Sequence, residues 1–145
     1  MFSKVITLLS LAVISFSSVA LAESIPTLSL GKYELTSGDE EYCSELEIKK
    51  SDITDKYLKI GKDRFSLSNK EFKEPSDFDT SCEDHLISTR EDDDTSTKLT
   101  RINKEVCKGS IKNSSLKSVI VTAQTITINQ KKDQKDLGTC VFTKK

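Results

Sequence analysis

The sequence predicts an all-β protein of about eight antiparallel strands, folded as an up-and-down barrel, with a β-sandwich as the alternative. Residue usage is the first observation behind this prediction. The chain after residue 22 holds 13 threonines, no methionine and one alanine, Ala123. Threonine favours strands, whereas alanine and methionine favour helices. The second observation is that apolar and polar residues alternate along short segments, which is the period of a strand.

The alternation places strands near residues 29–36, 43–50, 56–61, 64–68, 84–90, 97–106, 116–129 and 138–144. Leu58 and Phe65 lie on either side of the turn Gly61-Lys62-Asp63, so the third and fourth segments are expected to form a hairpin. Residues 116–129 are expected to form one long strand. Residues 68–84 are expected to connect two strands as a surface loop or one short helical turn.

Residues 1–22 have the features of a signal peptide that is removed after export. Lys4 gives a short positive start, an apolar stretch follows, and Ala20-Leu21-Ala22 fits a small-residue cleavage site. We therefore expect residues 23–145 to be the mature chain, a single β-barrel domain. The short, clean leader is of bacterial type, so the expected location is the periplasm or the extracellular medium.

The composition of the mature chain excludes several classes of protein. Without Lys4 it carries 21 basic and 23 acidic side chains, a net charge of −2, which gives no reason to expect a nucleic-acid partner. No segment after the leader is long and apolar enough to predict a membrane span. Apolar residues make up only 36 of 123, so the core is expected to be thin and to depend on cross-links. We expect a monomer.

Four cysteines lie in the mature chain, and no two of them have the C-x-x-C spacing of redox or zinc motifs. In an exported chain this even number predicts two disulfides, for which three connectivities are possible. If residues 91–96 form a hairpin tip, Cys82 and Cys107 are equidistant from its centre between residues 94 and 95. Such residues face each other across a regular hairpin, so we expect Cys82–Cys107 and, for the remaining pair, Cys43–Cys140.

The residues give little support for catalysis, and no cofactor or metal is predicted. The single histidine, His85, lies beside Glu83 and Asp84, yet no nucleophile motif accompanies it, so it is expected to be an ordinary half-exposed residue. The acidic run at residues 91–94 offers oxygen atoms to calcium but lacks the spacing of a calcium loop. A hydrolase is therefore the least favoured function.

Two binding functions are considered instead. The first is a non-catalytic binding protein that holds a small apolar ligand in the barrel mouth, lined by Tyr33, Leu35, Leu58, Phe65 and Phe142. The alternative is a protein-binding or inhibitor module that docks on a basic partner, such as a hydrolase. Its contacts would come from two acidic segments, represented by Ser37, Asp39, Glu40, Glu41, Asp92, Asp93 and Asp94.

Two short motifs add family resemblances to these hypotheses. Gly31-Lys32-Tyr33 resembles the G-x-W signature that opens the first strand of lipocalins, with Tyr33 in the place of the tryptophan. A lipocalin-like barrel implies an apolar cup for a small hydrophobic ligand. The segment from Ser37 to Tyr42, SGDEEY, is similar to the S-G-x-x-Y loop of small periplasmic lysozyme inhibitors, one residue longer. That resemblance implies a loop that enters the cleft of a cationic hydrolase.

Overall fold

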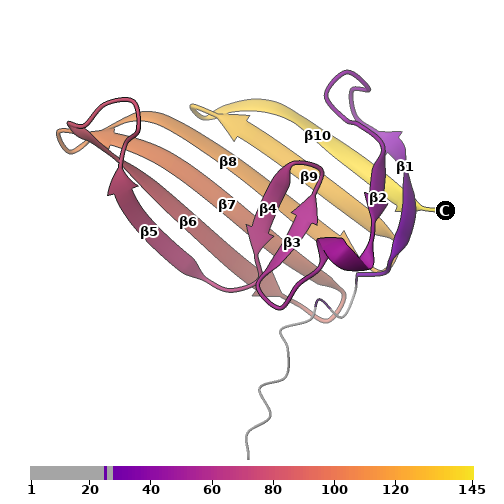
Figure 1. The fold of residues 1–145 in the computed structure, drawn as a ribbon. Helices are drawn as coiled ribbons and strands as arrows, with labels where there is room; N and C mark the ends of the chain where they lie inside the picture. The colour runs from indigo at the N-terminus through magenta and orange to yellow at the C-terminus, as the bar shows by residue number, and fades with distance from the viewer. Residues whose placement is uncertain (1–24, 26–27) are drawn as a thin grey trace, which may run out of the picture.

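Ten strands and one 3-10 turn make up the fold in the computed structural model, which describes Ile25 and residues 28–145 (Figure 1). They are β1 (Gly31–Ser37), β2 (Leu46–Ile48), η1 (Lys50–Asp52), β3 (Tyr57–Ile60), β4 (Asp63–Ser66), β5 (Lys70–Pro75), β6 (Cys82–Asp92), β7 (Ser96–Cys107), β8 (Ser110–Thr122), β9 (Thr125–Lys132) and β10 (Lys135–Lys144). The predicted all-β class is confirmed. The signal peptide predicted at residues 1–22 lies outside the described residues.

Eight of these strands form one antiparallel sheet in the order β2-β1-β10-β9-β8-β7-β6-β5. Because β2 and β5 are the two edges and do not pair with each other, the sheet is open and the preferred barrel is wrong. Both edges have features that discourage further strand pairing. β2 has only three residues, and β5 carries Lys70, Lys73 and Pro75.

The other two strands, β3 and β4, pair as the predicted hairpin and lie against one face of the sheet as a second layer (Figure 1). Leu58 and Phe65 are directly opposite each other in this hairpin, and both are buried. They share one apolar core with Leu99, Val119 and Phe142 of the sheet. The architecture is therefore two unequal β layers, which matches the sandwich alternative.

The long strand predicted over residues 116–129 is wrong, because β8 and β9 are separated by a turn at Ala123 and Gln124. The Thr122 hydroxyl accepts hydrogen bonds from the backbone N–H groups of Gln124 (3.3 Å) and Thr125 (2.9 Å). A threonine hydroxyl can stabilise a turn in this way. The turn contains no Gly, Pro, Asn or Asp, so the alternation of apolar residues passes through it without a visible break.

The expected connection over residues 68–84 contains a further strand that the sequence did not predict. β5 pairs antiparallel with β6, with Lys70 opposite Ser88 and Pro75 opposite Glu83. All six β5 residues are exposed, so there is no buried face to produce an apolar alternation. Pairing with a long neighbouring strand, rather than local propensity, therefore determines this element.

Both predicted disulfides are present. Cys82 and Cys107 begin β6 and end β7, and they are directly opposite in the register of this hairpin. Cys43–Cys140 joins the segment before β2 to β10. None of the four cysteines, all in the described part of the chain, is free, which is typical of proteins from oxidising compartments. The described residues include no helix of the length and apolar character that crossing a membrane would require.

Candidate functional site

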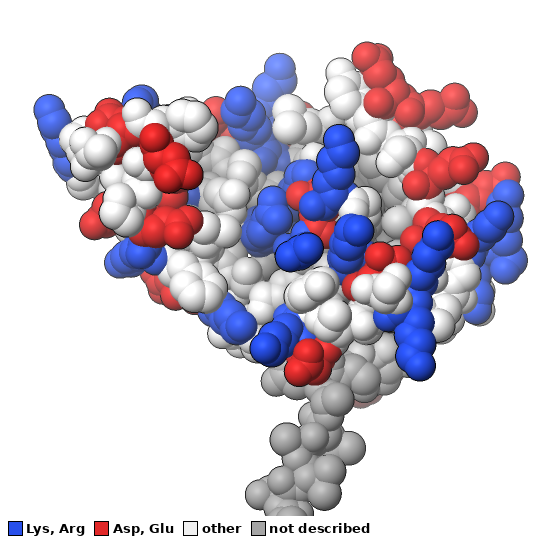
Figure 2. Space-filling model, in the orientation of Figure 1, with Lys and Arg blue, Asp and Glu red and all other residues white. Residues whose placement is uncertain are grey.

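Residues 38–45, named the acidic loop here, project from the sheet edge between β1 and β2 (Figure 1). The loop carries the carboxylates of Asp39, Glu40, Glu41 and Glu45, and all four residues are exposed. Acidic side chains gather over this part of the molecule, at the upper right of Figure 2. The loop therefore presents a concentrated negative charge at one end of the molecule.

Hydrogen bonds and a disulfide hold the acidic loop in place. The carbonyl oxygen of Asp39 accepts hydrogen bonds from the N–H groups of Tyr42 (3.1 Å) and Cys43 (2.9 Å). The Asp39 carboxylate accepts another from the N–H of Glu41 at 2.9 Å. The Cys43–Cys140 disulfide then fastens the end of this turn to β10. These contacts reduce the conformational entropy that the loop would lose on binding a partner.

Gly38 allows the loop to turn tightly against β10. Its φ angle of +126° lies in a region that residues with a side chain rarely adopt. A Cβ atom at this position would also lie 2.7 Å from the Thr139 carbonyl oxygen and 2.9 Å from Cys43 Sγ. The glycine of the SGDEEY segment is therefore required for the close approach of the loop to the disulfide.

Tyr42 completes the loop and was not among the predicted contact residues. Its side chain is 67% exposed, although the next residue, Cys43, is buried. The aromatic ring thus stands beside several carboxylates on a fixed turn. Aromatic faces and carboxylates both attract lysine and arginine side chains. The sequence feature that could have identified Tyr42 is its position, directly between an acidic run and a disulfide cysteine.

The second predicted acidic segment, at residues 92–94, uses two of its carboxylates to build its own turn. Asp92 accepts a hydrogen bond from the Thr97 hydroxyl (2.6 Å) and forms an ion pair with Arg90 (2.7 Å). Asp93 Oδ1 accepts hydrogen bonds from the backbone N–H groups of Thr95 and Ser96, both at 2.7 Å. These bonds show that Asp92 and Asp93 stabilise the turn between β6 and β7, which accounts for acidic residues at this position.

The structure does not bring the two acidic segments together. The acidic loop follows β1 and the second segment follows β6, and five steps across the sheet separate these strands, about 24 Å at the usual strand spacing. Leu35 on β1 and Asp92 on β6 are aligned across the sheet through the paired residues of the strands between them. Because β1 and β6 run in opposite directions, the acidic loop and the second segment lie toward opposite ends of the strands. A single partner surface that uses both segments is therefore not supported. Ser37, at the end of β1, adjoins only the acidic loop.

The hydrogen bonds to Asp93 lower the pKa of its carboxyl group from 3.8 to about 2, with the Ser96 hydroxyl as the largest cause. A carboxyl with a lowered pKa stabilises the fold above pH 4, and this contribution is lost as the pH falls toward 2. We expect Asp93→Asn to be less stable than the wild type at pH 6, with the difference shrinking between about pH 4 and pH 2. Urea unfolding at a series of pH values measures this.

Asp94→Asn is the matched control. It removes the same charge from the same turn, but the hydrogen bonds that hold this turn are accepted by Asp93 and not by Asp94. A constant difference between the wild type and Asp93→Asn down to pH 2 would contradict the linkage between protonation and stability at this turn.

The structure does not bring the predicted ligand-lining residues together around one apolar cup. Tyr33, Leu58, Phe65 and Phe142 are buried in the core cluster, and Leu35 is packed against it. Phe65 and Phe142 line one hollow of about 340 Å³ beside the acidic loop, and Tyr33 and Leu35 line a different one. This result corrects the expectation of a hollow barrel, because an open sheet covered by a hairpin closes its apolar face by direct packing.

No family model, curated protein or solved structure matches this chain. The resemblances to lipocalins and to periplasmic lysozyme inhibitors therefore stay predictions.

His85 and one cysteine-containing cluster are the other candidates for chemistry, and local contacts account for both. His85 Nε2 lies 3.2 Å from Glu83 Oε2, two positions earlier on the same face of β6. In the described part of the chain, one group of metal-ligand type is close enough to hold an ion, Asp79 with Cys82 and Cys107. Its two sulfur atoms are bonded to each other, so they are not thiolate ligands.

Proposed function

We propose that this chain is an exported, monomeric, non-catalytic binding protein that captures a basic protein partner through the acidic loop. It would act in the periplasm or outside the cell. The observation that carries the proposal is the combination of a fixed, projecting turn with exposed Tyr42 beside the carboxylates of Asp39, Glu40 and Glu41. A small apolar ligand in the interior is disfavoured, because the residues expected to hold it are buried in the core.

The chemistry of the acidic loop fits a protein surface rich in lysine and arginine. Tyrosine is common among the residues that dominate binding energy, because it buries a large rigid area and loses little entropy. Surrounding carboxylates accelerate the encounter with a cationic partner and align it. The SGDEEY segment, which resembles the cleft-entering loop of lysozyme inhibitors, lies in this projection. A basic hydrolase such as lysozyme is therefore the first partner to test.

The test is to neutralise Asp39, Glu40 and Glu41 together, as Asp39→Asn, Glu40→Gln and Glu41→Gln. We expect the wild type to bind lysozyme or another basic protein from a panel with ribonuclease A and cytochrome c. The triple variant should bind the same partner about tenfold more weakly or worse. Isothermal titration calorimetry at low and high salt measures both values, and the wild-type affinity should fall as salt is added.

A second triple variant controls for net charge. Asp55→Asn, Glu71→Gln and Asp77→Asn remove the same charge from exposed positions outside the acidic loop. This variant should keep most of the wild-type affinity. Equal losses in the two triple variants would show that only net charge matters, and the absence of binding to every basic protein would reject the proposal.

A further inference from the structure

The hairpin of β3 and β4 covers only part of its face of the sheet. Toward the end that carries the Cys82–Cys107 disulfide, the molecule is hollowed beside the hairpin (Figure 2). A hollow of about 420 Å³ lies there, and its lining includes Glu74, Phe78, Leu86, Asn103, Glu105 and Lys132. It is remote from the acidic loop, which adjoins the opposite edge of the sheet (Figure 1).

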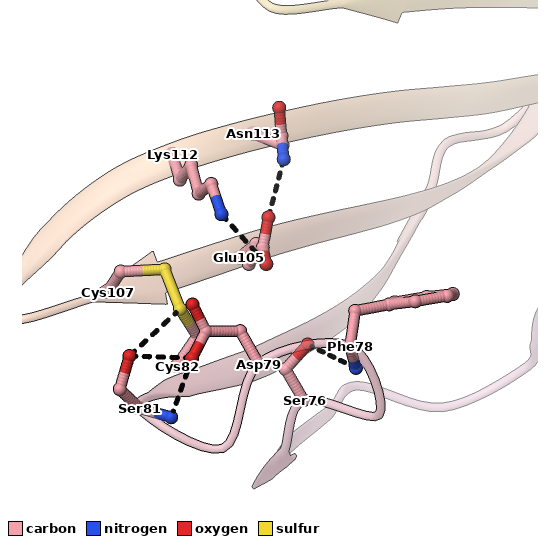
Figure 3. Close-up of polar contacts among 9 residues, drawn as sticks. All are labelled: Ser76, Phe78, Asp79, Ser81, Cys82, Glu105, Cys107, Lys112 and Asn113. Carbon is pink, nitrogen blue, oxygen red and sulfur yellow. Dashed lines mark hydrogen bonds and ion pairs between the residues drawn. A yellow bond between two sulfur atoms is a disulfide. The ribbon is translucent and has the colours of Figure 1, made fainter.

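Strand register arranges the polar side chains of this hollow in two neighbouring rows across the sheet. One row consists of Leu86, Asn103, Ser115 and Lys132, and the other consists of Glu74, Asp84, Glu105 and Asn113. In the second row, Asn113 Nδ2 donates to Glu105 Oε2 at 2.5 Å, and Lys112 Nζ lies 3.9 Å from the same carboxylate (Figure 3). The floor of the hollow therefore offers both donors and acceptors within a few ångströms.

A short loop between β5 and β6 holds Phe78 at the rim of this hollow. The N–H of Ser76 donates to the Cys82 carbonyl at 3.0 Å, and the N–H of Phe78 donates to the Ser76 hydroxyl at 3.4 Å. The Asp79 carboxylate accepts hydrogen bonds from the N–H (3.0 Å) and the hydroxyl (2.7 Å) of Ser81 (Figure 3). These contacts fix the loop, although the Phe78 side chain is 96% exposed. The ring is therefore presented to solvent on a rigid support.

Exposure of this ring leaves hydrophobic stabilisation unused. Burying a phenylalanine side chain usually stabilises a fold, and Phe78 does not contribute this stabilisation because it is exposed. A ligand with an apolar face would cover the ring and recover part of that energy. Because the loop is already ordered by its hydrogen bonds and by the Cys82–Cys107 disulfide, little entropy would be lost.

Asn103 is the second unusual feature of the hollow. Its Oδ1 atom is buried and has no hydrogen-bond partner among the described residues. A buried acceptor left unpaired destabilises a fold, and native structures keep few of them. Rotation of the amide toward the hollow would allow a ligand hydroxyl or N–H group to pair with it. A ligand is thus one way to relieve this cost.

The charges around the hollow restrict the class of ligand. The row with Glu74, Asp84 and Glu105 would repel an anion, and Lys112 and Lys132 beside it would oppose a cation. A neutral ligand with many hydroxyl groups suits such a mixed lining, because each hydroxyl both donates and accepts. We propose that this hollow binds a neutral saccharide, with its apolar ring face on Phe78 and its hydroxyl groups on Asn103 and the acidic row.

The experiment titrates the full exported chain with neutral tetrasaccharides at millimolar concentration: cello-, malto-, xylo- and N-acetylchito-tetraose. Amide chemical shifts from NMR report both the affinity and the location of binding. We expect at least one sugar to bind and to shift the signals of residues 76–78, 103 and 113–115. Chitosan tetramer and oligogalacturonate are the cationic and anionic probes, and both should bind more weakly.

Phe78→Ala should weaken sugar binding roughly tenfold, in line with the loss of an aromatic contact. Tyr42→Ala is the matched control, an exposed aromatic residue on the acidic loop, and should leave sugar binding unchanged. Asn103→Leu should also weaken binding but should keep or raise the melting temperature, because it removes the unpaired acceptor.

The proposal is overturned if none of the neutral sugars binds, if a charged probe binds more tightly, or if Phe78→Ala and Tyr42→Ala have equal effects. Capture of a basic protein by the acidic loop is a separate measurement. Phe78→Ala should not change that capture, so failure of one proposal is distinguishable from failure of the other.

Discussion

Replacing Cys43 and Cys140 by alanine is expected to lower the free energy of unfolding by about 4.7 kcal/mol at 25 °C. This disulfide joins residues 97 positions apart, so it restricts the unfolded chain strongly. The Cys82–Cys107 bridge closes a loop of only 25 residues, for which the same relation gives about 3.5 kcal/mol. Because small domains often have only about 5–15 kcal/mol of stability, either loss is severe.

Urea denaturation of the two double-alanine variants measures this difference directly. The Cys82→Ala, Cys107→Ala variant is the matched control, since it removes the same number of sulfur atoms from a shorter loop. The Cys43→Ala, Cys140→Ala variant should unfold at the lower urea concentration. A larger loss from the shorter bridge would contradict the assignment of the longer one as the main constraint on the unfolded chain.

The Cys43–Cys140 bridge should also matter for binding. Both cysteines are buried, Cys43 within the acidic loop and Cys140 on β10, and a Cβ atom at Gly38 would lie only 2.9 Å from Cys43 Sγ. Without the bridge, the hydrogen bonds that Asp39 accepts remain as the local support of the loop. The affinity for a basic partner should therefore fall in this variant even under conditions where the rest of the sheet stays folded.

The sequence was sufficient to predict the disulfides because the β6–β7 hairpin is regular. From Cys82 to Asp92 every residue has one partner on β7, without a bulge, so counting from the tip gives the correct pair. The next hairpin has a register shift between Glu105 and Val106. Pairing residues by counting outward from the β7–β8 turn would therefore assign partners that are wrong by one residue beyond that shift.

Closure of the sheet could not be predicted from the strands themselves. The alternation of residues shows which face of a strand is buried, but an open sheet covered by a hairpin and a closed barrel bury the same faces. The features that distinguish them lie at the edges. Lys70, Lys73 and Pro75 are residues that natural proteins place on edge strands, but they become informative only after β5 is known to be a strand.

The candidate binding loop was predicted in part. The acids at residues 39–41 were identified from their charge, and the structure places them on an exposed turn. Asp92 and Asp93 have the same charge but bond to their own turn, and sequence alone does not separate these two uses. Phe78 was visible only as a residue in an irregular segment. Its role depends on strands that are distant in sequence and meet only in the folded sheet.

Replacing Phe65 by alanine is expected to lower the free energy of unfolding by about 3–5 kcal/mol. Phe65 lies on β4, is 2% exposed and packs in the core between the hairpin and the sheet. The substitution removes the aromatic ring from this core and leaves a cavity that neighbours such as Leu58 and Leu99 fill only partly. Urea denaturation again provides the measurement.

Phe78→Ala is the matched control for this substitution, because it removes the same ring from a position that is 96% exposed. Its effect on stability should stay within about 0.5 kcal/mol. The comparison distinguishes a packed interior from a hollow one, since a ring that merely lines a ligand cavity has contacts on one side and contributes less. A loss below about 1 kcal/mol for Phe65→Ala would therefore restore the apolar-ligand hypothesis, because the hairpin would then cover a hollow and not a core.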